Sequence, residues 1–190
     1  NLHSPCHQMR LTRGVELTEG AQVIIGGPPC QPFSVNGHQN GKRDERDGFP
    51  AYLWAVERYR PRVAVFENVR GMLYQNREYF ATIVRQLERL GYRVEWQLLN
   101  AVDYGVPQNR ERLFVVAHNG IFSFPEPTHH HKPVTAGEAL GELAMSIPEG
   151  ARFLTPSMDA YVARYEQASK CIRPRDLHLD QQSRTVTCRN

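Results

Sequence analysis

Short apolar runs alternate with amphipathic stretches along the first two-thirds of the chain, and this alternation limits the possible folds more than any other feature. Residues 22–26 (QVIIG) have β-branched side chains at their centre and end in Gly-Gly-Pro-Pro, which is typical of a buried strand. Residues 78–90 instead place their apolar side chains at helical spacing. The same criteria predict strands at residues 22–26, 63–66, 92–99 and 113–117, and helices at residues 51–60 and 78–90.

Strands that alternate with helices in this order are typical of an α/β fold, in which helices cover a mostly parallel sheet. The link between the last two predicted strands, residues 100–112, contains Gly105 and Pro107 and leaves little room for a crossover helix. A short irregular link favours an antiparallel arrangement of the strands that it joins. The sequence therefore predicts a mostly parallel sheet with an antiparallel last strand.

The regular pattern weakens after about residue 120. Prolines recur within residues 125–133, and only two further helices are predicted, at residues 135–143 and 157–170. We therefore expect residues 1–125 to form one part of the protein. Residues 126–190 are expected to be a transition into a second region.

Composition argues against several classes of function. No apolar run approaches the roughly 18 residues of a membrane span, and the first residues lack the basic start and apolar stretch of a secretory signal. The four cysteines form no CxxC pair, which indicates a reduced, cytoplasmic protein without a zinc site. The run His129–His131 is interpreted as a loop of solvated histidines. A net charge of +3 fits a polyanionic partner without requiring one.

Three segments that are far apart in sequence carry reactive side chains to one edge of the predicted sheet. Cys30 follows the first strand and Glu67 follows the second, and the carboxyl ends of parallel strands meet at one edge. The start of an antiparallel last strand lies at the same edge, and it carries Arg110 and Arg112. Each residue alone has an ordinary structural interpretation, as a buried thiol, a capping carboxylate or a salt-bridging pair. Their coincidence predicts a site that combines a thiol, a carboxylate and guanidinium groups.

The sequence around each of these residues resembles a motif of the DNA cytosine-5 methyltransferase family. Residues 26–34 (GGPPCQPFS) resemble the family's nucleophile motif, residues 67–69 (ENV) its base-contacting motif, and residues 108–112 (QNRER) its QxRxR motif, in matching order. The resemblance extends over residues 20–125. It implies a Rossmann-like, S-adenosylmethionine-dependent methyltransferase fold, with double-stranded DNA as the partner and S-adenosylmethionine as the methyl donor.

The resemblance and the chemistry assign the same roles to these residues. Carbon 5 of cytosine is a poor nucleophile, and addition of the Cys30 thiolate at carbon 6 would activate it. Glu67 is expected to protonate the ring nitrogen and to bind the exocyclic amino group. Arg112 is expected to bind the carbonyl oxygen, with Arg110 supporting that contact or binding a phosphate. Asn68 is expected to hold the adjacent loop in place.

The target base must leave the duplex to reach such a site. Residues 31–47 are expected to close over the DNA and to contact phosphates through the basic side chains Lys42, Arg43 and Arg46. Pro29 and Phe49 match positions that lie near the cofactor in the family.

The sequence also departs from the family. The cofactor-binding glycine motif, F-x-G-x-G, is absent, and residues 184–187 (RTVT) resemble only the start of a late motif. We therefore expect a fragment or one subunit of a split enzyme, which needs an N-terminal half or a complementary subunit and is inactive alone. Without a preceding strand, residues 22–26 would form an exposed sheet edge.

Three functions stay open from the sequence. The first is a methyltransferase region, from a bacterial restriction-modification system or from a methylase acting alone, in the cytoplasm and associated with the nucleoid. The second is a non-catalytic DNA-binding fragment, which the intact Cys-Glu-Arg set disfavours. The third is an enzyme acting on cytosine in RNA, since such enzymes share these motifs.

Overall fold

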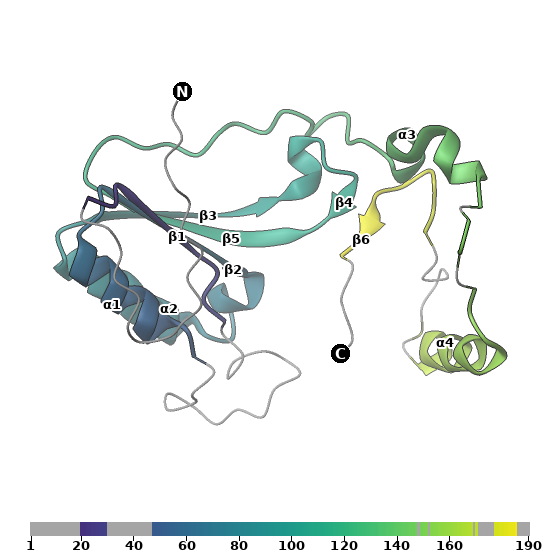
Figure 1. The fold of residues 1–190 in the computed structure, drawn as a ribbon, viewed down its shortest axis with the longest axis horizontal. Helices are drawn as coiled ribbons and strands as arrows, with labels where there is room; N and C mark the ends of the chain where they lie inside the picture. Colours follow the sequence, from purple (N-terminus) through teal and green to yellow (C-terminus); the bar gives the residue numbers. More distant parts are fainter. Residues whose placement is uncertain are drawn as a thin grey trace. The chain divides into compact units, whose positions relative to one another are not determined.

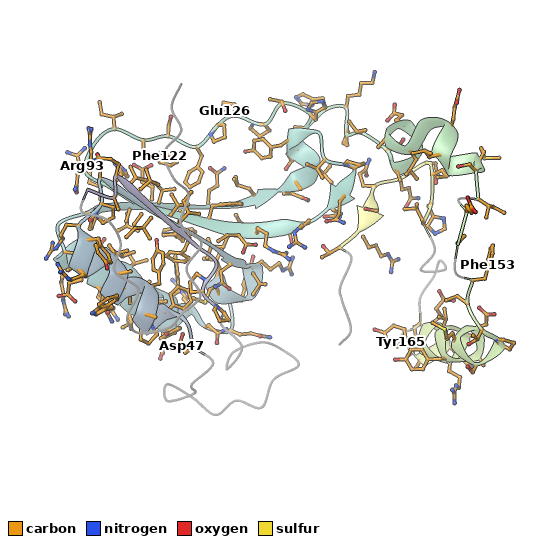
Figure 2. The ribbon with its side chains drawn as sticks, viewed as in Figure 1. Asp47, Arg93, Phe122, Glu126, Phe153 and Tyr165 are labelled. Carbon is orange, nitrogen blue, oxygen red and sulfur yellow. The ribbon has the colours of Figure 1, made fainter. Side chains whose placement is uncertain are left out.

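Strands and helices alternate along the chain as an α/β fold requires (Figure 1). The computed structural model describes residues 20–29, 47–147, 149–151, 153–168, 170 and 177–185. The strands are β1 (Val23–Gly26), β2 (Val63–Val69), β3 (Arg93–Asn100), β4 (Gln108–Asn109), β5 (Glu111–His118) and β6 (Ser183–Arg184). The α-helices are α1 (Phe49–Tyr59), α2 (Arg77–Arg89), α3 (Ala136–Leu140) and α4 (Pro156–Ala168), and the 3-10 helices are η3 (Arg70–Leu73), η4 (Ala101–Tyr104) and η5 (Gly141–Met145). Within these described ranges, no helix has the length and apolar character needed to cross a membrane.

Four of the strands form a mixed sheet in the order β1-β2-β5-β3. β1 runs parallel to β2, with Val23 opposite Val63. β5 runs antiparallel to β2, with His118 opposite Val63 at one end and Arg112 opposite Val69 at the other. The predicted α/β class, the parallel pairing of the first two strands and the antiparallel last strand are confirmed. Among the strands of the described residues, β1 lies at one end of this order.

One face of the sheet packs against α1 and α2, which lie together on the same side of it (Figure 1). Phe66 of β2 and Leu113 of β5 are fully buried there, together with Leu87 of α2. The Phe66 ring meets the ring of Phe49 edge to face, with centroids 5.2 Å apart. α2 forms because its buried side chains recur at helical spacing, which gives the helix one apolar face to pack against the sheet.

Side chains of β2 alternate between the two faces of the sheet. Phe66 and Asn68 point toward the helices and are buried, so Glu67 and Val69 point to the opposite face. In an antiparallel pair, residues directly opposite each other share a face. Arg112, opposite Val69, therefore lies on the same face as Glu67.

Two strands extend beyond the ends that the sequence predicts. The sequence places Glu67 after its strand and Arg112 before its strand, whereas β2 continues through Val69 and β5 begins at Glu111. This part of the prediction was wrong because the ladder between β2 and β5 continues as far as the Val69–Arg112 pair, and no local pattern reveals that pairing. Both charged side chains consequently stand on the sheet itself rather than on loops.

The described residues group into two compact units. Those within Asn1–Leu99 and Glu111–Glu126 form the first, and those within Asn100–Arg110 and Pro127–Asn190 form the second. The second unit contains a parallel pair of short strands, β4 and β6. It also contains α3, whose first turn is closed by a capping box between Thr135 and Glu138. The hydrogen bonds from Thr135 lower the pKa of the Glu138 carboxyl group, because they stabilise its charged form.

The histidine run packs more specifically than the sequence predicts. His130 and His131 are exposed, in line with a solvated loop. The ring of His129, however, is half-buried against Gly105, where an added Cβ would lie 2.9 Å from His129 Cε1. His130 pairs with Asp103 at 3.1 Å between Nδ1 and Oδ1. Glycine is favoured at position 105 both by this close approach and by its φ of +83°.

The packing of Leu113 predicts a large loss of stability on truncation. Leu113→Ala should lower the free energy of unfolding by about 2–5 kcal/mol, because it leaves a cavity in the core between the sheet and the helices. Ile121→Ala is the matched control, since Ile121 is 101% exposed in the same unit. Chemical denaturation followed by circular dichroism measures both changes. Equal stability losses in the two variants would contradict the packing described.

Candidate active site

An ion pair between Glu67 and Arg112 forms the centre of the candidate site. Arg112 Nε lies 2.7 Å from Glu67 Oε1, and the two side chains are 19% and 38% exposed. Glu67 is directly opposite Phe114, so Arg112 is its diagonal neighbour across the two strands, within reach of a long side chain. The structure thus brings together two of the side chains that the sequence predicts to meet.

The guanidinium group of Arg112 has a second anchor. Its Nη1 donates to the carbonyl oxygen of Glu111 at 2.7 Å. The carboxylate of Glu111 in turn accepts a hydrogen bond from Arg70 Nη1 at 2.7 Å, and this contact raises the pKa of Arg70. An arginine has five N–H donors, and these two contacts with described residues use two of those of Arg112.

Asn68 joins the carboxyl ends of β1 and β2. Its side chain is buried, and its Nδ2 donates to the carbonyl oxygen of Pro28 at 3.0 Å. Its Oδ1 accepts the N–H of Val69 at 2.9 Å. The expectation that Asn68 holds the adjacent loop is confirmed. This hydrogen bond places the Pro28–Pro29 segment beside the end of the strand that carries Glu67.

The Pro28–Pro29 segment is also held from its other side. The N–H of Gly48 donates to the carbonyl oxygen of Pro29 at 3.1 Å. Pro28 is buried, whereas Pro29 is exposed. Cys30 lies outside the described residues, as does the loop at positions 31–46.

The two residues expected near a cofactor differ in accessibility. Pro29 is exposed. Phe49 is completely buried, and its ring meets Phe66 and Tyr79 edge to face. A direct side-chain contact between Phe49 and a cofactor does not fit this burial. The N–H of Phe49 donates to Asp47 Oδ1 at 3.0 Å, and Asp47 also accepts a hydrogen bond from Tyr79, so these residues fix the start of α1.

Arg110 belongs to the second unit, and its main chain is fixed there. Its N–H donates to Asn100 Oδ1 at 3.0 Å, and its carbonyl oxygen accepts the N–H of Ala101 at 3.0 Å. Among the residues that the structure describes, no group of three or more histidine, cysteine, aspartate or glutamate side chains could hold a metal ion.

The comparisons with known proteins agree with the motifs. The family described as C-5 cytosine-specific DNA methylase matches residues 1–170. The chain belongs to this family. It is 57% identical, over all of its 190 residues, to the Type II methyltransferase M.AplI of Arthrospira platensis, and covers 55% of that protein. It is 41% identical over 140 residues to the Type II methyltransferase M.NgoMIV of Neisseria gonorrhoeae, a match that covers 71% of this chain and 44% of the relative.

A solved structure supports the fold of this methylase chain. A prophage-encoded protein from E. coli, assigned as a DNA modification methyltransferase, superposes with a TM-score of 0.50 at 26% identity. The match covers 67% of this chain and 35% of that protein. The chain thus spans about half the length of the curated relatives named above, and about a third of this structure.

Two residues that hold the predicted arginines are not singled out by sequence reasoning. Glu111 holds Arg112 through its carbonyl oxygen and Arg70 through its carboxylate. Asn100 holds the main chain of Arg110. An asparagine at the end of a predicted strand, before a tight turn, is a signal for the second, because asparagine side chains commonly bond to nearby backbone N–H groups.

Because Gly48 lies so close to Pro28 and Pro29, we predict that a methyl group added at Gly48 will disturb the packing of these two prolines. In Gly48→Ala the new Cβ would lie 2.5 Å from Pro29 Cδ and 3.2 Å from Pro28 Cα. We expect a loss of about 1–3 kcal/mol in the free energy of unfolding, since the two prolines must shift. Gly27→Ala is the control, because nothing lies within 4 Å of its added Cβ. Chemical denaturation measures both, and an unchanged Gly48→Ala variant would rule out the tight packing.

Proposed function

We propose that this chain carries the catalytic groups of an enzyme that transfers a methyl group from S-adenosylmethionine to carbon 5 of cytosine in double-stranded DNA. The reaction proceeds through a covalent adduct between Cys30 and a flipped-out base. The observation that supports this most is the ion pair between Glu67 of β2 and Arg112 of β5. Asn68, the residue after Glu67, binds the carbonyl oxygen of Pro28.

A peptide bond joins Cys30 to Pro29, and Pro29 is held at its carbonyl oxygen by Gly48. Fixing the residue before the nucleophile limits the volume that the thiol can search, which favours attack on a positioned base. The thiolate forms a carbon–sulfur bond at carbon 6 while a proton is added to ring nitrogen 3, and carbon 5 becomes nucleophilic. After carbon 5 has taken up the methyl group, it loses its proton to a base, ring nitrogen 3 returns its proton to Glu67, and the thiolate leaves.

The ion pair gives Glu67 and Arg112 complementary tasks. Oε1 of Glu67 accepts the hydrogen bond from Arg112, so its other oxygen, Oε2, can face the base. That oxygen accepts a hydrogen bond from the exocyclic amino group, and the carboxylate takes up a proton from water and passes it to the adjacent ring nitrogen. The remaining N–H groups of Arg112 bind the carbonyl oxygen, where negative charge develops during addition. Arg110 supports that contact or binds a phosphate.

S-adenosylmethionine supplies the methyl group when bound, and Pro29, which matches a position near the cofactor in the family, is exposed and can contact it. Phe49 contributes indirectly, by packing under the start of α1 and the Gly48 contact.

The biological setting follows from the relatives, which are Type II methyltransferases. We infer a bacterial restriction-modification role, or a methylase acting alone, in the cytoplasm at the nucleoid. Residues 31–47, with Lys42, Arg43 and Arg46, close over the DNA and contact phosphates. We assign residues 1–125 to the catalytic part and residues 126–190 to a transition into target recognition.

Trapping of the covalent adduct tests the nucleophile and the substrate together. The intact natural polypeptide that contains these residues, mixed with S-adenosylmethionine and a duplex that carries 5-fluorocytosine, should form an adduct that survives denaturing electrophoresis. Cys30→Ser should abolish the adduct, because the serine hydroxyl is a far weaker nucleophile at neutral pH. Cys171→Ser is the matched control and should leave the adduct intact. An adduct on fluorinated RNA but not on DNA would favour the RNA enzyme, and none on either would favour a non-catalytic fragment.

Replacement of the Glu67 carboxylate by an amide tests its assigned role. Glu67→Gln keeps an oxygen that can accept the hydrogen bond from Arg112. Its amide group, however, cannot transfer a proton to the ring nitrogen. The methylation rate constant should fall by about 10²–10⁴-fold, while the affinity for DNA stays nearly unchanged. Single-turnover methylation and a DNA-binding titration measure the two quantities. Glu57→Gln, on the exposed side of α1, should match the wild type. An unchanged rate in Glu67→Gln would remove this residue from the mechanism.

A further inference from the structure

The side chain of Asn100 closes the loop that precedes the arginines. Asn100 is the last residue of β3, and its Oδ1 accepts the N–H of Arg110 at 3.0 Å and the N–H of Val102 at 3.4 Å. Its Nδ2 donates to Asn109 Oδ1 at 3.0 Å. One half-buried amide thus bonds to both ends of a loop about ten residues long.

The main chain of Arg110 is held on both of its sides by this arrangement. Its N–H donates to the side chain of Asn100, and its carbonyl oxygen accepts the N–H of Ala101. The preceding residue, Asn109, is held as well, because its carbonyl oxygen accepts the hydroxyl of Thr185 at 2.9 Å. With both peptide groups fixed, the Cα–Cβ direction of Arg110 is fixed too, and only its side-chain torsions stay free.

We propose that Asn100 is a positioning residue for methyl transfer, acting through Arg110. This inference rests on the proposed function, in which Arg110 supports the contact to the base carbonyl oxygen or binds a phosphate. Without Asn100, the N–H of Arg110 loses its acceptor and the loop gains conformational freedom. Arg110 then spends less time in the reactive arrangement, and a small misplacement of a catalytic group carries a large kinetic penalty.

The carbonyl oxygen and the amino group of the Asn100 side chain make different hydrogen bonds, so substitutions that remove all of these bonds or only alter them can be compared. Asn100→Leu has a similar volume but removes all three hydrogen bonds. Asn100→Asp keeps an oxygen for the N–H groups of Val102 and Arg110. Its second oxygen can accept from the amide of Asn109 once that amide rotates by half a turn, since oxygen and nitrogen occupy equivalent positions in an amide. The aspartate variant should therefore restore what the leucine variant loses.

The test uses the intact natural polypeptide that contains these residues. Asn100→Leu should lower kcat for DNA methylation by up to about 100-fold, and Asn100→Asp should recover most of that loss. In a variant that already carries Arg110→Ala, Asn100→Leu should lower kcat little further, because both substitutions remove the contribution of a positioned Arg110 side chain. Asn119→Leu, at an exposed position, is the matched control and should behave as the wild type. Additive losses in the double variant, or no recovery in Asn100→Asp, would overturn the proposal.

A second measurement separates this inference from the proposed function. Hydrogen exchange, read by mass spectrometry on peptides that cover residues 100–112, should accelerate in Asn100→Leu and return toward the wild-type rate in Asn100→Asp. If the wild type formed no adduct with fluorinated DNA, the proposed function would fail, and exchange would still decide whether Asn100 fixes Arg110. If the exchange rate did not change in Asn100→Leu, the proposal that Asn100 fixes the main chain of Arg110 would be refuted, whatever methylation activity the variant showed.

Discussion

The antiparallel ladder between β2 and β5 determines where the charged groups of the candidate site lie. Because Arg112 is opposite Val69 and Phe114 is opposite Glu67, the two charged side chains are diagonal neighbours on one face of the sheet. A shift of the register by one residue would move the side chains of one strand to the other face, and the ion pair would be lost. The buried side chains on the helix face, such as Phe66 and Leu113, fix this register, since a shift would expose them. Core packing and site geometry are therefore set by the same pairing.

Asparagine side chains perform a second structural task at the ends of the strands. Asn68, near the end of β2, binds the carbonyl oxygen of Pro28, and Asn100, at the end of β3, accepts the N–H of Arg110. In both cases a short amide side chain bonds to the backbone of a loop. Asparagine suits such positions because it both donates and accepts. The two loops that carry the proposed nucleophile and Arg110 are thus each tied to a sheet strand by a side chain.

Arg70, Glu111, Arg112 and Glu67 form one continuous row of contacts. Arg70 binds Glu111, the carbonyl oxygen of Glu111 binds Arg112, and Arg112 binds Glu67. Positive and negative side chains alternate along this row. Each charged group therefore lowers the electrostatic free energy of placing its neighbour's charge at this site. Because Arg112 is only 19% exposed, its pairing with Glu67 is screened less than a pair on the open surface would be. Preorganisation of this kind favours binding of a base whose carbonyl oxygen gains negative charge.

The sequence by itself determined the alternation of strands and helices, the antiparallel last strand and the segments that carry the site. Apolar periodicity and strand direction are local properties, so residues such as Glu67 and Arg112 could be assigned to one sheet edge without coordinates. The family motifs added the expected roles of Cys30, Glu67 and the arginines. Only the tertiary structure decided that Glu67 and Arg112 stand within strands, that Phe49 is a core residue, and that Asn100 holds Arg110. The first two features depend on contacts between residues distant in sequence, whose free energies no local pattern encodes. The third depends on how the loop brings the N–H of Arg110 back to Asn100.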